Sequence, residues 1–210
     1  MALEIEYGRK EWRTDPAAAY AEAERRIALA ASAEDPADRK AILFSDLGAL
    51  RAIPPGLGRV EGLRRLIVGD ARTPDGMFHA PRQHIEDLSA LAEAPTLIEL
   101  NLARVGAPDL APIAGLTALQ SLDLHSSQVA DLAPLAGLTA LRSLDLRDMQ
   151  VADLAPLAGT TALQTLYLGF TQVADLAPLA GMTALQSLDL GGTTQVADLA
   201  PLAGLTALQT

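Results

Sequence analysis

The sequence predicts an α/β solenoid in which stacked coils share one parallel β-sheet. Two observations carry this prediction: a period of 22 residues from Leu116 onward, and leucines that recur at fixed positions within each period. Residues 116–137 and 138–159 are identical at 18 of 22 positions. A fixed period of this length is typical of repeat architectures, in which one unit cannot bury its apolar side chains without its neighbours.

Each repeat has a segment that favours a strand and a segment that favours a turn. In the repeat 116–137 we expect a strand over 120–124, with Leu122 and Leu124 pointing inward and the residues between them pointing outward. Asp131 is placed to cap a short 3₁₀ turn over 132–135. The repeat therefore predicts a parallel sheet on one side of the solenoid and short 3₁₀ turns on the other.

The N-terminal segment has the pattern of a helix. Asp15 supplies an N-cap before Pro16, and Pro36 prevents the helix from continuing. Between them, small and apolar side chains recur at spacings of three and four, at Tyr20, Ala23, Ile27 and Ala30. Because the first coil of a solenoid needs a cover, we expect residues 1–40 to form a helical cap.

The rest of the chain divides by the regularity of its repeats. Residues 41–93 contain irregular repeats interrupted by an insertion over 69–84, and residues 94–210 contain the regular ones. The sequence stops within an expected strand, at 205–210. We therefore expect a truncated C-terminus, with an uncapped last coil that could pair end to end with a second copy.

Composition limits the classes of partner. The chain carries a net charge of −10, and residues 94–210 hold ten acids, three arginines and no lysine. Such a surface repels nucleic acid and anionic membranes, so neither is expected as a partner. The first residues lack the apolar core of a secretory signal, and the chain has no cysteine, so we expect a cytoplasmic protein without disulfides or thiolate metal sites.

The leucines have the spacing of a known repeat class. They stand at 132, 135, 138, 141, 144 and 146 and are followed by Val151. This pattern resembles the short bacterial leucine-rich repeats of the internalins and of the phosphatase-regulator type. The resemblance implies a horseshoe whose concave β-sheet binds protein partners. Similar bacterial repeats are joined to Roco-type GTPase or Toll/interleukin-1-receptor-type domains, so a further expectation is the sensing arm of a larger protein.

The chain departs from that class after each strand, where the family usually has asparagine. The corresponding residues here are Val105, Ser127, Met149, Thr171 and Thr194. Hydroxyl groups can replace part of an asparagine ladder, whereas valine and methionine cannot. We therefore expect a weaker polar spine and a larger contribution of leucine packing to stability.

The positions that differ between near-identical coils point to a binding surface. They lie on the outward side of the strands and in the turn that follows. Tyr167 and Phe170 stand out, because only 3% of the residues are aromatic and aromatics dominate interface hot spots. The expected partner-binding residues are Asn101, Asp123, His125, Asp145, Arg147, Asp148, Tyr167, Phe170 and Asp189. The function that this pattern favours is protein–protein interaction. The alternatives are a regulatory subunit of an enzyme such as a phosphatase, and a structural spacer.

Neither catalysis nor a metal or other cofactor is expected. Ser121, Asp123 and His125 resemble a hydrolase triad, but alternate strand residues lie roughly 6.6 Å apart along the chain, too far for a direct relay. His79 and His84 in the insertion have no established ligand spacing. The aspartates that recur before each turn are explained as turn caps.

Overall fold

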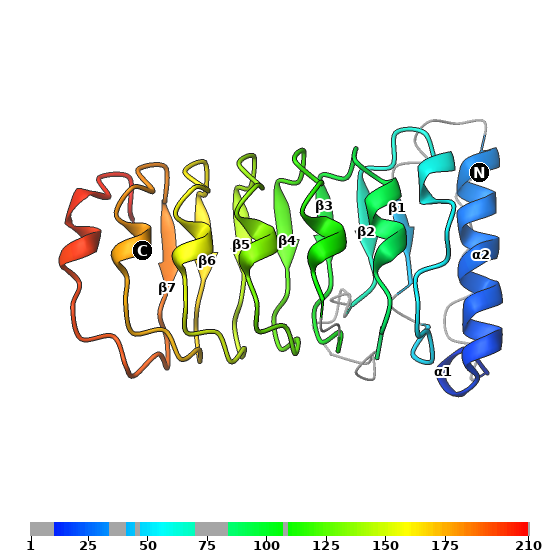
Figure 1. The fold of residues 1–210 in the computed structure, drawn as a ribbon, viewed down its shortest axis with the longest axis horizontal. Coiled ribbons are helices and arrows are strands. Elements are labelled where there is room, and N and C mark those ends of the chain that lie inside the picture. The colour runs from blue at the N-terminus through cyan, green and yellow to red at the C-terminus, as the bar shows by residue number, and fades with distance from the viewer. Residues whose placement is uncertain (1–10, 34–40, 45–46, 70–83, 107–108, 210) are drawn as a thin grey trace.

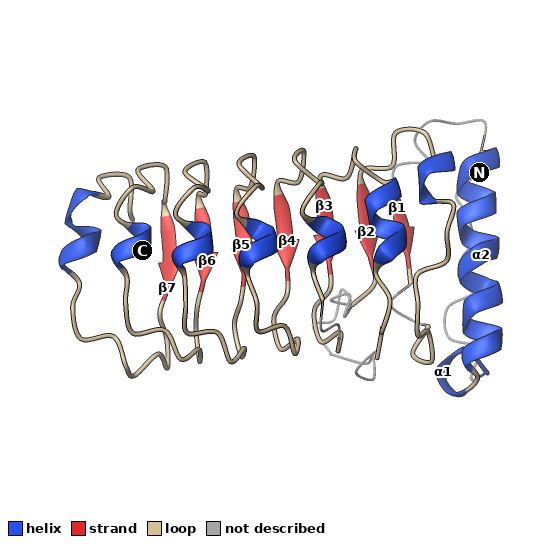
Figure 2. Ribbon diagram, in the orientation of Figure 1, coloured by secondary structure: helices blue, strands red, loops and turns tan. Residues whose placement is uncertain are grey.

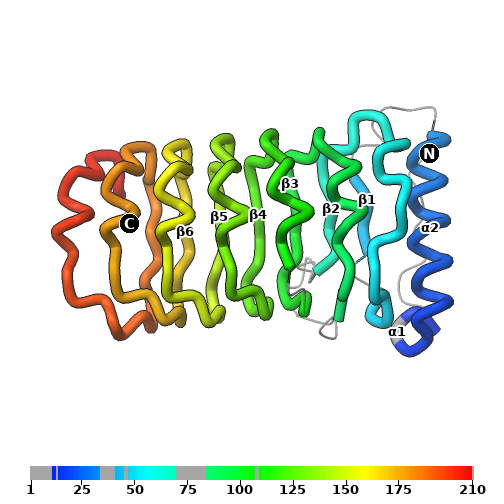
Figure 3. The backbone as a smooth tube through the Cα atoms, in the orientation of Figure 1, coloured from blue at the N-terminus to red at the C-terminus, as the bar shows by residue number. Residues whose placement is uncertain are grey.

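The structure, a computed structural model, describes residues 11–33, 41–44, 47–69, 84–106 and 109–209. The chain forms an elongated stack of coils that begins beside an N-terminal helix (Figure 1). Most of the insertion, including His79, lies outside the described residues. The path of the backbone confirms a solenoid, since each coil runs next to the one that precedes it in the sequence (Figure 3).

One face of the solenoid is a parallel β-sheet. The described residues form seven strands that lie in chain order. The strands are β1 (Ala41–Leu43), β2 (Arg65–Ile67), β3 (Glu99–Asn101), β4 (Ser121–Asp123), β5 (Ser143–Asp145), β6 (Thr165–Tyr167) and β7 (Ser187–Asp189). Short 3₁₀ helices lie on the opposite face (Figure 2). This arrangement confirms the predicted fold class.

The register of the sheet follows the repeat. Leu122 pairs with Leu144, and Leu144 with Leu166, each 22 residues further along the chain. Leu66 pairs with Leu100 across 34 residues, so the 12 additional residues are accommodated outside the two strands. Equivalent residues of successive coils therefore lie side by side on the sheet face.

The 3₁₀ helices begin as the sequence predicts. Their bounds are η1 (Leu57–Arg59), η2 (Ser89–Glu93), η3 (Ala111–Ile113), η4 (Ala133–Leu135), η5 (Ala155–Leu157), η6 (Ala177–Leu179) and η7 (Ala200–Gly204). The Oδ1 atom of Asp131 accepts a hydrogen bond of 2.8 Å from the backbone N–H of Ala133. The aspartates at the same place in five other coils make the same bond. These carboxylates are turn caps, which confirms the explanation given for the aspartates that recur before each turn.

The N-terminal end is covered by α1 (Glu11–Thr14) and α2 (Pro16–Ser32). Asp15 caps α2 through hydrogen bonds from the N–H groups of Ala17 and Ala18. None of the helices among the described residues combines the length and the apolar character that crossing a membrane requires.

The buried side of α2 includes an ion pair that the apolar pattern does not predict. Glu22 and Arg26 are both buried, whereas Tyr20 is half-exposed. Arg26 donates to Glu22 at 2.9 Å and to the carbonyl oxygen of Leu43 in β1, and it lies over the ring of Trp12 at 5.2 Å. Burial raises the pKa of Glu22, but hydrogen bonds from Arg25 and Arg26 outweigh it and leave that pKa below its ordinary value.

The core is one continuous cluster, mainly of leucine, isoleucine, valine and alanine side chains, that extends from the N-terminal helix to Leu205. Leu66, Leu100, Leu144 and Leu166 are completely buried along the inner side of the sheet. Stacking therefore gives each coil the apolar cover that it lacks alone.

A polar ladder runs behind the strands in place of the asparagines of the family. Thr171 and Thr193 both donate their hydroxyl groups to the carbonyl oxygen of Leu168, at 2.7 and 2.9 Å. The prediction of Thr194 at this place is wrong: Thr193 is buried there, and Thr194 is exposed. Met149 fills the equivalent place in its own coil as a buried side chain, and its sulfur accepts a hydrogen bond of 3.8 Å from the hydroxyl group of Ser127 in the preceding coil.

Candidate recognition surface

The strands and the turns after them bring the nine predicted partner-binding residues onto one face. Asn101, Asp123, Asp145, Tyr167 and Asp189 form a row across β3 to β7, because each pairs with the next in the sheet register. His125 and Arg147 stand two residues further on, and Asp148 and Phe170 follow in the turns. The hydrogen bonds between coils continue there, since the N–H of Phe170 donates to the carbonyl oxygen of Gly191.

Four members of the row have a structural role as well as an outward position. In each, a side-chain oxygen accepts a hydrogen bond from the backbone N–H two residues later, which ends the strand with a turn. These bonds join Asn101 to Ala103, Asp123 to His125, Asp145 to Arg147 and Asp189 to Gly191. Tyr167 occupies the same place in β6 and has no side-chain acceptor suited to this bond. The local structure therefore explains the acidic members of the row and leaves the tyrosine unexplained.

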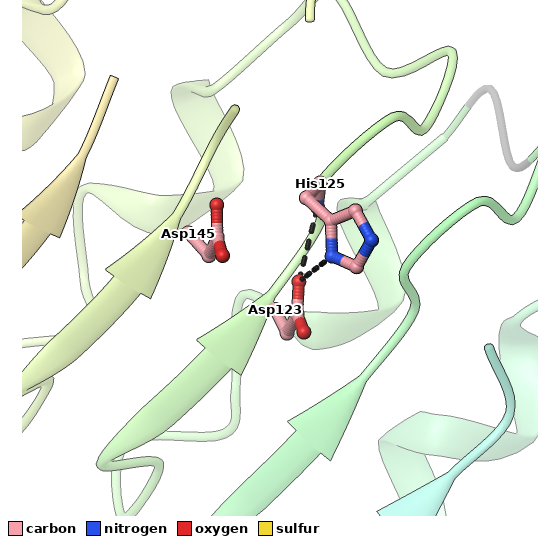
Figure 4. A group of neighbouring side chains, drawn as sticks. All are labelled: Asp123, His125 and Asp145. Atoms are coloured by element: carbon pink, nitrogen blue, oxygen red, sulfur yellow. Dashed lines mark hydrogen bonds and ion pairs between the residues drawn. The ribbon is translucent and has the colours of Figure 1, made fainter. Parts of the chain in front are cut away.

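Asp123 and His125 contact each other directly (Figure 4). The Nδ1 atom of His125 lies 2.8 Å from Oδ1 of Asp123, and Asn101 donates to the other carboxylate oxygen at 3.3 Å. The expectation that alternate residues stand too far apart is wrong for this pair, because the two side chains lean together where the strand ends. The hydrogen bond to Asp123 raises the pKa of His125, and the charge of Asp145 adds to it, while burial and Arg147 act in the opposite direction.

His125 therefore links stability to pH. Its pKa is higher in the folded chain than the ordinary 6.5, so its stabilising contribution is complete below about pH 6.5 and is lost as the pH rises through the folded-state pKa. We expect an NMR titration of the His125 ring to give a midpoint above that of a model peptide. Asp123→Asn should return the midpoint toward the ordinary value. An unchanged midpoint in this variant would contradict the assignment of the shift to Asp123.

Asp145, Arg147 and Tyr167 form a second cluster beside the first. Arg147 holds Asp145 through hydrogen bonds from Nε and Nη2, and its guanidinium lies 4.8 Å from the centre of the Tyr167 ring. The hydrogen bond to Asp145 raises the pKa of Arg147 further above its already high value. The ion pair and the ring contact together fix the guanidinium plane on the sheet face.

Asp123, His125 and Asp145 each offer a possible metal-ligand atom, and these three atoms lie within 4.8 Å of one another (Figure 4). In the structure their acceptor atoms already have partners. Asp123 contacts His125 and Asn101, and Asp145 contacts Arg147. A divalent ion would have to displace Arg147 from Asp145, and we assign no metal to these residues.

Phe170 is the most exposed large apolar side chain among the described residues, with 68% of its surface accessible. Its backbone adopts the left-handed conformation, with φ at 57°. Arg104, Ser126 and Asp148 adopt the same conformation at the same place in their coils, and Gly192 does so in the next coil. A bulky aromatic residue in this conformation is unusual, because it costs about 1–2 kcal/mol relative to the right-handed regions.

A hollow of about 380 Å³ lies beside Phe170. Its lining consists of His125, Arg147, Asp148, Gly169, Phe170, Asp189, Gly191 and Gly192. The sequence comparison between coils identifies the charged and aromatic members of this lining but not its glycines. The sequence does contain a signal that could have identified the glycines. Histidine and arginine at 125 and 147 are replaced at the equivalent positions 169 and 191 by glycine, which has no side chain.

Comparisons with known proteins agree with this architecture. A family model described as leucine-rich repeats (two copies) matches residues 161–204. Internalin C2 from Listeria monocytogenes is 27% identical, with a TM-score of 0.64 over 99% of this chain and 97% of the internalin chain. No curated protein matches the sequence.

Two more distant structures share the fold. TLR13 in its complex with ssRNA13 is 21% identical, with a TM-score of 0.56 over 79% of this chain and 29% of the receptor chain. The ectodomain of the Arabidopsis thaliana receptor kinase GASSHO1/SCHENGEN3, in complex with Casparian strip integrity factor 2, is 19% identical, with a TM-score of 0.56 over 80% of this chain and 24% of its own.

The stacked coils, the parallel sheet and the 22-residue leucine pattern define a leucine-rich-repeat protein. Within that class, its solenoid is similar to those of the internalins.

Proposed function

We propose that this chain is a recognition module that binds a protein partner on its sheet face, over β5 to β7. The observation that carries the proposal is Phe170, an exposed aromatic side chain on a strained backbone, in a chain where aromatics are scarce. A glycine would hold the same turn at lower cost, as Gly192 does in the next coil. Tyr167 supports the proposal, because it replaces the strand-ending carboxylate that its neighbours use.

In this proposal Arg147, Tyr167 and Phe170 provide the central contacts, since arginine and aromatic side chains are enriched at the energetic centres of interfaces. Asp148 and Asp189 lie beside them, and Asn101, Asp123 and His125 continue the surface toward β3. Asp145 is buried and contributes by holding Arg147. The acidic balance of the regular repeats argues against RNA as the partner, because a surface without a basic patch gains nothing from phosphate contacts.

The test compares two variants that make the same backbone change in different coils. Phe170→Gly should abolish capture of the partner from a lysate of the source organism, while Ser126→Gly should leave capture intact. Both replacements relieve the left-handed strain, about 1 kcal/mol, so neither should lower the melting temperature. Capture is measured by affinity purification with quantitative mass spectrometry. Equal recovery of every protein by the wild-type and Phe170→Gly chains would refute the proposal.

A further inference from the structure

The geometry points to a basic side chain, lysine or arginine, of the protein partner as the occupant of the hollow beside Phe170. This inference rests on the proposed function and specifies the chemistry of the partner at one place. It follows from the shape of the hollow, from its charge and from the aromatic ring at its edge.

The hollow owes its shape to glycines at a position of the repeat where the two preceding coils carry side chains. His125 and Arg147 carry side chains at this position, whereas Gly169 and Gly191, which also line the hollow, carry none. A Cβ atom at Gly169 would lie 3.3 Å from Oδ2 of Asp189 and 3.1 Å from the carbonyl oxygen of Gly191, so a side chain there would crowd both oxygens. The resulting volume of about 380 Å³ has room for a long side chain.

The charge around the hollow is negative and incompletely balanced. Arg147, which also lines the hollow, makes a bidentate contact with Asp145, and the charge of Asp189 acts on it as well. Asp148 is exposed and Asp189 half-exposed, and within the described part of the chain no ion pair joins either carboxylate to a cation. Asp189 uses Oδ1 for the N–H of Gly191, and the residue lines the hollow. Two carboxylates at one hollow favour a cation there.

The aromatic ring of Phe170 is the third feature that favours a basic side chain. Its ring packs against Gly192, where a Cβ atom would lie only 2.5 Å from two ring carbons, and most of the ring remains exposed. An aromatic face attracts ammonium and guanidinium groups, and its edge covers the methylene groups of the same side chains. An acidic partner would be repelled by Asp148 and Asp189. A purely apolar one would remove both carboxylates from water without compensation.

The experiment titrates the full chain, ¹⁵N-labelled, with four blocked amino acids and follows the backbone amides by NMR. The probes are N-acetyl methylamides of arginine, lysine, norleucine and glutamate. We expect the arginine and lysine probes to shift the amides of Gly169, Gly191 and Gly192, with dissociation constants on the order of 10 mM. The norleucine and glutamate probes should bind at least fivefold more weakly.

Charge-removing variants then test the carboxylates. Asp189→Asn keeps the strand-ending turn, because Asn101 makes the same bond in β3, and Asp148→Asn changes an exposed side chain. Each should weaken the arginine probe at least threefold. Glu24→Gln, which removes one charge from the exposed side of α2, should leave it unchanged.

The outcomes separate this inference from the proposed function. Equal shifts with norleucine and arginine, absence of shifts up to 50 mM probe, or unchanged affinity in both asparagine variants would overturn the basic-side-chain assignment. Partner capture that fails in Phe170→Gly but survives in the Asp148→Asn/Asp189→Asn double variant would also overturn it, while leaving the proposed function intact. Loss of capture in both variants, with shifts limited to the cationic probes, would support it.

Discussion

Leu144→Ala is expected to lower the free energy of unfolding by about 3–4 kcal/mol. Leu144 is completely buried in β5 and lies between Leu122 and Leu166 of the adjacent strands. Removing its side chain leaves a cavity that the neighbouring coils cannot fill, because their own leucines are fixed by the same register. Urea unfolding followed by circular dichroism measures the loss.

Leu188→Ala is the matched control, since Leu188 has the same place in the repeat but is only partly buried in β7. We expect it to cost about 1 kcal/mol, because less apolar surface and a smaller cavity are involved. Equal losses at the two leucines would contradict the view that stacking on both sides determines the stability of a coil. Hydrogen exchange should also show faster opening of the coils next to residue 144, since each coil is supported only by its neighbours.

Arg26→Ala is expected to cost about 3–4 kcal/mol, because it leaves the buried carboxylate of Glu22 without its inner partner. The side chains of Arg26 and Glu22 are only 5% and 8% exposed. The substitution also removes the donor to the carbonyl oxygen of Leu43 and the cation over Trp12. Thermal and urea unfolding measure the loss of stability. Unfolding of the variant should begin at the N-terminal coils.

Arg25→Ala provides the comparison for this prediction. Arg25 contacts the same carboxylate at 2.7 Å, but its side chain is 54% exposed. An exposed pair contributes at most about 1 kcal/mol, so we expect a loss in that range. If the two alanine variants were equally stable, Arg26 would have no special role in joining α2 to β1.

The sheet and its register could be predicted from the sequence because the period alone determines them. A 22-residue repeat leaves one way to align leucines between coils, and Leu122, Leu144 and Leu166 follow it. The aspartate caps could be predicted equally well, because an aspartate two residues before a 3₁₀ helix has a local hydrogen-bonding role. Both features depend on short-range chemistry that every coil repeats.

The parts that could not be predicted depend on contacts between non-repeated residues. Glu22 and Arg26 have charged side chains, so an apolar pattern assigns them to the exposed side of α2. Their burial is explained by their ion pair and by contacts of Arg26 with the carbonyl group of Leu43 and the ring of Trp12. The position of Thr193 depends on where an extra residue is accommodated within a loop, which two adjacent threonines leave ambiguous.

The candidate surface likewise has parts that the sequence predicts and parts that only the structure shows. Tyr167 and Phe170 could be identified because they interrupt a repeat, whereas the strand-ending bonds of Asp123 and Asp145 became visible only in three dimensions. Those bonds show that an acidic column can be maintained by the local fold, and that its outward position alone does not indicate a ligand.

The left-handed residue in the turn after each strand from β3 to β7 has a consequence for how such a surface can change. Its backbone N–H is used between coils, as in the bond from Asp148 to Gly169. Arginine, serine, aspartate, phenylalanine and glycine all occur at this place with a similar φ. The solenoid thus carries a row of positions about 4.8 Å apart at which residues of different size and charge occur on the same scaffold. Duplication of one coil would lengthen the row by one position, so new specificity can arise by copying and point mutation alone.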